Sequence, residues 1–271
     1  MTQTRSESAD EIRSRDADES YGPVFAAVYD AEWKRHVPVV GAALIRFAET
    51  DDDISVNRPV LDVCCGTGHV SCHLANHGFD VVGIDASPHM IGRARENAEK
   101  TDDAHRLRFA VQDATEMNVG RGFGLAVSTL DAMNHLTDLA ELRKCFSSVR
   151  TALAPGGVFV FDMHTVSGLR ELNRVEVRET PDTLFVARTI YDPYAEVLVA
   201  RISGCRRDGA TWQRFTHSVR ERAYPSRSIE EALHDAGFDR VHAAEPADLH
   251  TPLPNADDLP RAFYVARNST S

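Results

Sequence analysis

Two carboxylates in this chain stand at spacings that suit the binding of a nucleoside. Asp85 ends an apolar stretch about 20 residues after the glycines Gly66 and Gly68, as ribose-binding carboxylates do. Asp113 ends a later apolar stretch, where it could accept a hydrogen bond from an exocyclic adenine amine. Glycine suits a backbone that turns sharply or lies against a ligand. Together these residues predict a site for an adenosine-containing molecule.

The elements that position these residues form a βαβ unit. Residues 60–63 are an apolar strand that leads into the turn at Gly66 to Gly68. Residues 69–77 have the apolar rhythm of a helix, with Gly78 where a C-terminal cap belongs. Residues 80–85 form a second buried strand. Strand, glycine turn, helix and strand in this order carry more weight than a lone Gly-x-Gly pair.

Two classes of cofactor use such a unit, and Asp85 alone does not separate them. Dinucleotide-binding folds prefer Gly or Ala three residues after the second glycine, where this chain has Ser71. Asp62, inside the first strand, would be a poor neighbour for a pyrophosphate but a suitable one for an ammonium group. These residues favour a cofactor other than a nicotinamide dinucleotide.

Three motifs follow one another along the chain: Asp62-x-x-Cys65-Gly66-Thr67-Gly68, Asp85-Ala86-Ser87-x-x-Met90 and Asp113-Ala114. In this order they resemble the cofactor motifs of the class I S-adenosylmethionine-dependent methyltransferases, in particular those that act on small molecules and carry a β-strand insert. The resemblance implies an α/β fold with a Rossmann-like, seven-stranded doubly wound sheet whose last strand is antiparallel. It also implies S-adenosylmethionine as cofactor and S-adenosylhomocysteine as product.

The resemblance further implies where the cofactor would lie. The loop from Gly66 to Gly68 would contact its methionine part, and Asp85 would hold the ribose diol. Met90 would pack on the adenine, while Asp113 with Ala114 would read the adenine edge. The full predicted set is Tyr21, Tyr29, Trp33, Cys64, Gly66, Thr67, Gly68, Asp85, Ala86, Met90, Gln112, Asp113, Ala114, Thr129 and Leu130.

The N-terminal part divides into a polar segment and an aromatic one. Residues 1–20 have almost no large apolar group and are predicted to be a disordered tail. The following helical segment carries Tyr21, Tyr29 and Trp33. In the family that this chain resembles, such a helix covers the cofactor, and an aromatic face attracts a cation such as the sulfonium. An apolar stripe packed on the sheet is the simpler interpretation.

Candidate catalytic residues follow the strand predicted over residues 123–129. Asp131, Asn134 and His135 lie in a loop at the carboxyl end of this strand, where open α/β sheets place their chemistry. A hydroxyl acceptor would need a base, and His135 has the right ordinary pKa for one, although it could instead only cap the next helix. His164 ends the strand over residues 158–164 and is a candidate for contact with the acceptor.

The period of the sequence changes after residue 171. Residues 172–225 read as antiparallel strands inserted between two parts of the core, residues 21–171 and 226–271. This insert is predicted to be a lid over the substrate, with Arg214 and Tyr224 as candidate contacts to an acidic acceptor. An extra sheet that stabilises or dimerises the protein is the alternative, and a homodimer is therefore possible.

Composition narrows the class of substrate. The formal net charge of −11 argues against a nucleic-acid partner, because such binding depends on Lys and Arg. No apolar run is long enough for a membrane span, no leader is visible, and no spacing suits a metal, so a cytoplasmic, metal-independent protein is expected. The sequence predicts a methyltransferase that acts on nitrogen or oxygen of a small metabolite. The alternatives are a non-catalytic scaffold that binds the S-adenosyl ligand and a nicotinamide oxidoreductase.

Overall fold

The computed structural model describes residues 21–269, so the predicted tail over residues 1–20 lies outside the described residues. The helices are α2 (Pro23–Trp33), η1 (Lys34–His36), α3 (Val37–Thr50), α4 (His69–Ala75), α5 (Pro88–Ala98), η2 (Ala104–Arg106), η3 (Ala132–His135), α6 (Leu139–Ala152), α7 (Val166–Glu171), α8 (Ser226–Asp235) and η4 (Ala256–Asp258). The strands are β1 (Val60–Val63), β2 (Val81–Asp85), β3 (Leu107–Val111), β4 (Phe123–Ser128), β5 (Leu153–His164), β6 (Val175–Thr180), β7 (Thr183–Asp192), β8 (Val197–Asp208), β9 (Thr211–Arg222), β10 (Arg240–Ala244) and β11 (Arg261–Arg267). Among the described residues, no helix is both long and apolar enough to span a bilayer.

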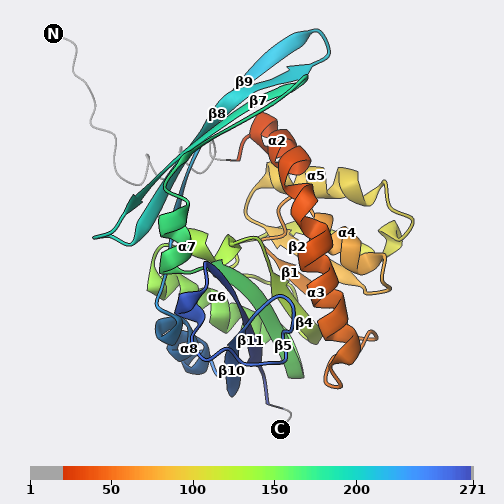
Figure 1. The fold of residues 1–271 in the computed structure, drawn as a ribbon. Helices are drawn as coiled ribbons and strands as arrows, with labels where there is room; N and C mark the ends of the chain where they lie inside the picture. The colour runs from red at the N-terminus through yellow and green to blue at the C-terminus, as the bar shows by residue number, and fades with distance from the viewer. Residues whose placement is uncertain (1–20, 270–271) are drawn as a thin grey trace, which may run out of the picture.

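Seven strands form one large, mostly parallel sheet (Figure 1). Their order is β10-β11-β5-β4-β1-β2-β3, and β1 to β5 pair in parallel. The last strand, β11, runs antiparallel to both of its neighbours, β5 and β10. The predicted Rossmann-like sheet with an antiparallel last strand is therefore confirmed.

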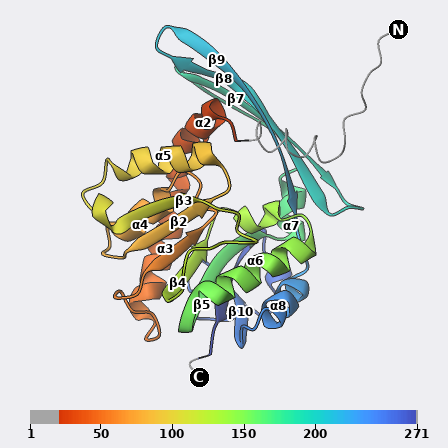
Figure 2. The same ribbon diagram turned by 180° about the vertical axis from the view of Figure 1, so that it is seen from behind.

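Both faces of this sheet are covered by helices, as Figure 2 shows from behind. Strand β5 illustrates the reason, because its side chains alternate between two apolar layers. Phe159 and Phe161 pack with residues of α6 and α8 such as Phe146. Val158 and Val160 pack on the other face with residues of α3 and α4. A strand buried on both faces is apolar throughout, which is why this segment could be recognised from the sequence.

The insert forms a separate four-stranded antiparallel sheet in the order β6-β7-β8-β9. In Figure 1 its long strands cross above α2 and α7, and β9 returns the chain to α8. One face of the insert packs on the N-terminal helix, where Phe185, Ile202 and Phe215 contact Phe25 and Val28 of α2. Helix and insert together therefore cover the end of the large sheet at which β1, β2 and β4 finish.

Candidate active site

A cavity of about 560 Å³ lies between the carboxyl ends of the parallel strands and the inner face of the insert. This volume is typical of a site for a small molecule. Most of the predicted cofactor residues line it, namely Tyr21, Tyr29, Trp33, Cys64, Gly66, Asp85, Ala86, Met90, Asp113, Ala114, Thr129 and Leu130. Of the other predicted site residues, Asp131, His135 and His164 also line this cavity.

Asp85 is held at the end of β2 by the backbone around it. Its Oδ2 accepts a hydrogen bond from the backbone N–H of Gly66 at 3.0 Å, and its Oδ1 accepts one from Ser87 at 2.9 Å. Burial raises the pKa of this carboxyl, while the two amide donors lower it. Each oxygen keeps a second lone pair for a ligand. The carboxylate is thus fixed in place and can still accept the two hydroxyls of a ribose.

The two glycines of the loop have different tasks. Gly66 has a φ of +55°, lines the cavity, and a Cβ there would lie 3.3 Å from the ring of Tyr29. Gly68 has a φ of +76° and does not line the cavity, and its Cβ would lie 2.9 Å from both Ala94 and Phe109. Gly66 therefore leaves room beside the cavity, whereas Gly68 allows helix and sheet to pack closely.

Thr67 and Asp62 both line a small pocket next to the main cavity. Ser71 Oγ donates a hydrogen bond of 2.6 Å to Asp62 Oδ2, and burial raises the pKa of Asp62 to about 7. Ser71 thus has a task that Gly or Ala could not perform at this position. This contact explains physically why the sequence departs from the dinucleotide pattern here.

Aromatic rings from the N-terminal helix form one wall of the cavity. Tyr29 and Trp33 are stacked with ring centroids 4.6 Å apart, and both line the cavity together with Tyr21. Burial raises the pKa of the Tyr21 and Tyr29 hydroxyls well above the ordinary value, so both rings stay neutral. Neutral aromatic faces in a desolvated site attract a cation.

The loop after β4 adopts a conformation that few residues tolerate. Leu130 and Asp131 have φ values of 61° and 58°, in the left-handed region. The fully buried carboxylate of Asp162 holds them, because it accepts hydrogen bonds from the backbone N–H of Leu130 at 2.7 Å and of Asp131 at 3.2 Å. Residues in such conformations concentrate at functional sites. Asp162 therefore fixes the loop that carries a candidate catalytic carboxylate.

Arg261, from the last strand, connects the charged groups of this region. Its Nη2 contacts Asp131 Oδ1 at 2.5 Å and His164 Nε2 at 2.7 Å, and its Nη1 pairs with Asp162. Coulombic attraction to Arg261 lowers the pKa of Asp131 despite its burial. Asp131 is thus ionised and paired with Arg261. These properties fit a structural role as well as a catalytic one.

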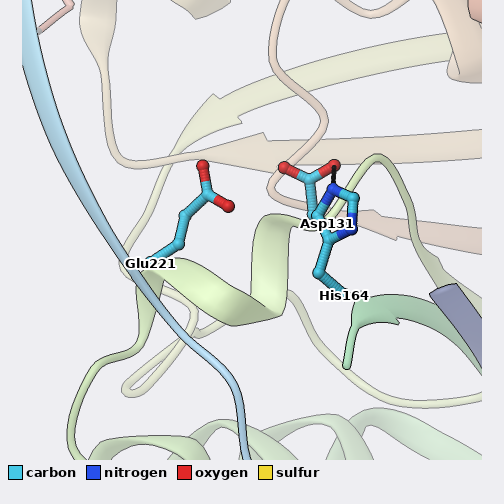
Figure 3. Close-up of side chains that lie close together, drawn as sticks. All are labelled: Asp131, His164 and Glu221. Atoms are coloured by element: carbon cyan, nitrogen blue, oxygen red, sulfur yellow. Dashed lines mark ion pairs between the residues drawn. The ribbon is translucent and has the colours of Figure 1, made fainter. Parts of the chain in front are cut away.

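Glu221 approaches this group from the insert (Figure 3). Asp131, His164 and Glu221 each offer one nitrogen or oxygen atom that could bind a ligand, and these three atoms lie within 4.8 Å of one another. Glu221 is 8% exposed, and its Oε2 has no hydrogen-bond partner among the described residues. Burial and the charge of Asp131 raise the pKa of Glu221 to about 8. Since the guanidinium of Arg261 already contacts Asp131 and His164, the donor set does not suit a metal ion.

His135 and Asn134 occupy different places although they are neighbours. His135 lines the cavity, and burial lowers its pKa, so the ring is neutral. Asn134 is fully buried outside the cavity lining. Its amide donates to the carbonyl oxygens of His164 and Arg222 and accepts from the backbone N–H of His164. Asn134 therefore joins the core to the insert, and its predicted catalytic role is corrected to a positioning one.

Three further predictions are corrected by where the side chains lie. Arg214 is exposed and lines no part of the cavity. Its neighbour Phe215 is buried on the inner face of β9, and because successive side chains of a strand point to opposite faces, Arg214 lies on the outer face. Tyr224 is buried and its hydroxyl donates to the carbonyl oxygen of Leu136 at 2.6 Å. Gln112 pairs with the backbone of Asn118 instead of facing the cavity.

Three residues of the site, Glu221, Arg261 and Asp162, were not predicted from the sequence. Glu221 shares the inner face of β9 with His217 and Val219, which also line the cavity. The two-residue period of this strand was the signal that could have found it. Arg261 and Asp162 lie on neighbouring strands of the large sheet, and no local pattern marks them.

Comparison with known proteins agrees with this arrangement. Residues 60–157 match the family described as methyltransferase domain. The protein named "Putative methyltransferase YqeM", from Bacillus subtilis (strain 168), is 28% identical over 252 residues, or 90% of this chain and 96% of that protein. An S-adenosylmethionine-dependent methyltransferase from Clostridium acetobutylicum ATCC 824 has a TM-score of 0.72 at 23% identity, covering 90% of this chain and 98% of that chain. The sugar N-methyltransferase KedS8 from Streptoalloteichus sp. ATCC 53650 has a TM-score of 0.63 at 20% identity, covering 99% and 97%.

These likenesses confirm the resemblance that the three sequence motifs predicted. They extend it from the motifs to the order of the strands and to most of the chain. Residues 60–157 therefore match a methyltransferase domain, and the chain has the fold of the class I S-adenosylmethionine-dependent methyltransferases.

Proposed function

We propose that this protein transfers the methyl group of S-adenosylmethionine to a nitrogen atom of a small molecule. The observation that carries the proposal is the continuity of the cavity. It runs from Asp85 at the end of β2 and Met90 of α5 to the inner face of the insert, so it can hold donor and acceptor together. Methyl transfer mainly requires this, because the sulfonium is already an activated leaving group and the protein must hold the reacting atoms in line.

The residues at the cofactor end fit an S-adenosyl ligand. Asp85 has free lone pairs for the ribose hydroxyls, Gly66 lacks the Cβ that would narrow the cavity, and Met90 with Ala114 offers an apolar surface for adenine. The rings of Tyr21 and Tyr29 give the positive sulfonium a neutral aromatic environment. When bound, the cofactor supplies a methyl group on positively charged sulfur.

The acceptor end favours a molecule without negative charge. Its wall consists of apolar side chains of the insert, namely Phe185, Ala187, Leu198, Ala200, Ile202 and Val219. Two arginines line the cavity, and each is already paired. Arg178 pairs with Glu32 at 2.5 Å and Glu176 at 2.8 Å, and Arg261 pairs with Asp131 and Asp162. A phosphate or carboxylate on the acceptor would thus lack a free cation, which argues against the acidic acceptor considered from the sequence.

Nitrogen is favoured over oxygen on two grounds. Glu221 brings a buried carboxyl group without a hydrogen-bond partner at its Oε2 into the cavity lining, and such a group suits a basic amine better than a hydroxyl. KedS8, which shares the fold, is named a sugar N-methyltransferase. The insert supports the proposal as a lid, because its apolar inner face excludes water from the place where the acceptor would lie.

The first test is calorimetric titration with S-adenosylhomocysteine. Wild-type protein should bind it, and Asp85→Ala should weaken binding about 30-fold, since two hydrogen bonds to the ribose are lost. The exposed Asp102 provides the control, because Asp102→Ala removes a carboxylate that does not line the cavity. Binding must then be followed by a screen of amines with labelled S-adenosylmethionine.

Other outcomes would point elsewhere. Binding of S-adenosylhomocysteine without methyl transfer to any acceptor would favour the scaffold. Binding of NADH in its place would favour the oxidoreductase, against which the Ser71–Asp62 hydrogen bond argues. Either result would contradict the proposed function.

Transfer to oxygen is the second candidate, and it is favoured by His135. This neutral, buried histidine lines the cavity, and its Nδ1 has no hydrogen-bond partner among the described residues. A hydroxyl acceptor would need such a base. If the acceptor is a hydroxyl, His135→Ala should lower turnover at least tenfold without changing the affinity for S-adenosylhomocysteine. An unchanged rate would remove His135 from the mechanism.

A further inference from the structure

We propose that Glu221 binds the ammonium group of the acceptor and takes its proton before methyl transfer. The acceptor would accordingly be a basic amine attached to an apolar body. This inference rests on the proposed transfer to nitrogen and assigns it a residue and a substrate class. It depends on the position of Glu221, on the charges around it and on the chemistry of an ammonium ion.

Glu221 lies where a buried carboxylate needs a partner. It is on the inner face of β9, lines the cavity, and is 8% exposed. Its Oε2 has no hydrogen-bond partner among the described residues. An ionised carboxylate buried without a partner is strongly unfavourable, so such groups are paired in almost all proteins. A cationic group of a ligand is the partner that the cavity allows.

The neighbouring groups leave the carboxyl group of Glu221 without a cationic partner among the described residues. Asp131 faces it across the cavity, but Asp131 is already paired with Arg261 at 2.5 Å and lies 3.6 Å from His164. Arg261 divides its guanidinium between Asp131 and Asp162, and Glu221 makes no ion pair with it within 4.0 Å. Arg261 therefore pairs with two carboxylates, and neither of these ion pairs includes Glu221. An ammonium ion beside Glu221 would supply the cation that its ionised form needs.

The geometry suits an ammonium ion better than a metal ion. Atoms of Glu221, Asp131 and His164 lie within 4.8 Å of one another, so a small group between them can contact more than one. An ammonium ion donates three hydrogen bonds and could reach both Glu221 and Asp131. A metal would have to displace Arg261 from two of the three atoms. The apolar wall of β7 and β8 would contact the rest of the acceptor.

The proton must leave before the nitrogen can react, because an ammonium ion has no lone pair. Glu221 accepts the proton, and the N–H electrons become the lone pair of the neutral amine. That lone pair forms the N–CH₃ bond while the S–CH₃ bond breaks. The electrons of the S–CH₃ bond stay on sulfur, which becomes a neutral thioether. The new N–CH₃ nitrogen carries the positive charge that sulfur has lost. A carboxyl whose pKa is raised to about 8 is a suitable base for this step.

Several groups decide the charge of Glu221. Asp131 disfavours its ionised form and Arg261 favours it. Tyr21, His135, His164 and His217 complete the surroundings, with the tyrosine hydroxyl neutral and the pKa of each histidine lowered by burial. Ionisation of Glu221 should therefore increase as the pH rises toward about 8, and with it the affinity for an ammonium ion.

The test compares an amine with an alcohol of the same shape. Cyclohexylmethylamine and cyclohexylmethanol are titrated into protein saturated with S-adenosylhomocysteine, at about pH 6 and pH 9. Wild-type protein should bind the amine at least tenfold more tightly than the alcohol at the higher pH, with a smaller preference at the lower one. Glu221→Gln should abolish the preference and its pH dependence. Glu179→Gln, which removes an exposed carboxylate from β6 of the same insert, should retain both.

A second readout is the rate of methyl transfer to amines with labelled S-adenosylmethionine. Glu221→Gln should lower it at least a hundredfold, with the affinity for S-adenosylhomocysteine unchanged. Equal binding of amine and alcohol by wild-type protein, or an unchanged preference in Glu221→Gln, would overturn the inference while the proposed methyl transfer stands. Failure of wild-type protein to bind S-adenosylhomocysteine would overturn both.

Discussion

The two ends of the cavity hold their carboxylates in different ways. At the cofactor end, Asp85 is fixed by backbone N–H groups of Gly66 and Ser87, from two adjoining turns of the large sheet. At the acceptor end, Asp131 is held by side chains from distant strands, and the buried Oε2 of Glu221 lacks a hydrogen-bond partner among the described residues. The first arrangement is complete without a ligand, whereas the second leaves a buried carboxyl group with which a ligand can pair.

This difference separates what is general in the fold from what is particular to this chain. Backbone donors at strand ends depend on the course of the main chain, so they persist when side chains change. The acceptor end depends on the insert, because β9 contributes Glu221 and β7 and β8 contribute the apolar wall. Substitutions on the inner face of the insert should therefore change the acceptor without changing cofactor binding.

The largest effect is expected from Arg261→Leu. Removal of the guanidinium leaves Asp162 fully buried and without its ion partner, which should lower the free energy of unfolding by about 4 kcal/mol. Urea denaturation at neutral pH measures this. Arg227→Leu is the control, because it breaks an exposed ion pair with Glu231 and should cost less than about 0.5 kcal/mol. A loss below about 1 kcal/mol for Arg261→Leu would show that the acceptor end does not depend on this network.

A smaller and pH-dependent effect is expected from Glu221→Gln. The pKa of Glu221 in the folded protein is about 8, above its ordinary value of 4.5. Its contribution to stability is therefore fully present below about pH 4.5 and is lost as the pH rises through about 8. Glutamine does not titrate, so the variant should gain on the order of 3 kcal/mol relative to wild type between about pH 5 and pH 9.

Paired urea titrations at both pH values measure this difference. Glu179→Gln is the matched control, since this carboxylate is exposed and lies outside the cavity. The comparison also removes the contribution of Asp62, whose raised pKa acts in the same direction in every variant. A constant difference between wild type and Glu221→Gln would contradict the interpretation of Glu221 as an unpaired buried acid.

The sequence predicted the two ends unequally for a physical reason. Gly66 and Asp85 lie within one βαβ unit and Met90 lies in the helix that directly follows it, so their spacing along the chain reflects their spacing in the molecule. Asp131 and His164 were also found, because each follows the carboxyl end of a recognisable strand. Glu221 lies between Arg220 and Arg222, and such a run of charges resembles a solvated face. Glu221 differs from its two arginine neighbours because it lies on the inner face of β9, and the register of the sheet decides which residues lie on that face.

The smallest effect is expected from Gly66→Ala, which tests whether the cofactor end is as rigid as its backbone contacts imply. The residue has a φ of +55°, and the added Cβ would lie 3.3 Å from the ring of Tyr29. We expect a loss of about 1 kcal/mol in stability and about tenfold weaker binding of S-adenosylhomocysteine, measured by thermal unfolding and calorimetry. The control is Gly92→Ala in α5, where a Cβ meets nothing within 4 Å and the φ is ordinary, so the helix should become slightly more stable.

Unchanged binding in Gly66→Ala would mean that Tyr29 moves aside without cost. The aromatic wall would then be adaptable, and the contrast between the two ends would weaken. A loss of binding together with an unchanged amine preference would place the effect of Gly66 at the cofactor end alone. Tyr29 stacks on Trp33, and the ring of Trp33 lies edge-on to that of Phe185 in the insert, with ring centroids 6.0 Å apart. Gly66→Ala therefore also tests whether the two ends are coupled through the aromatic wall.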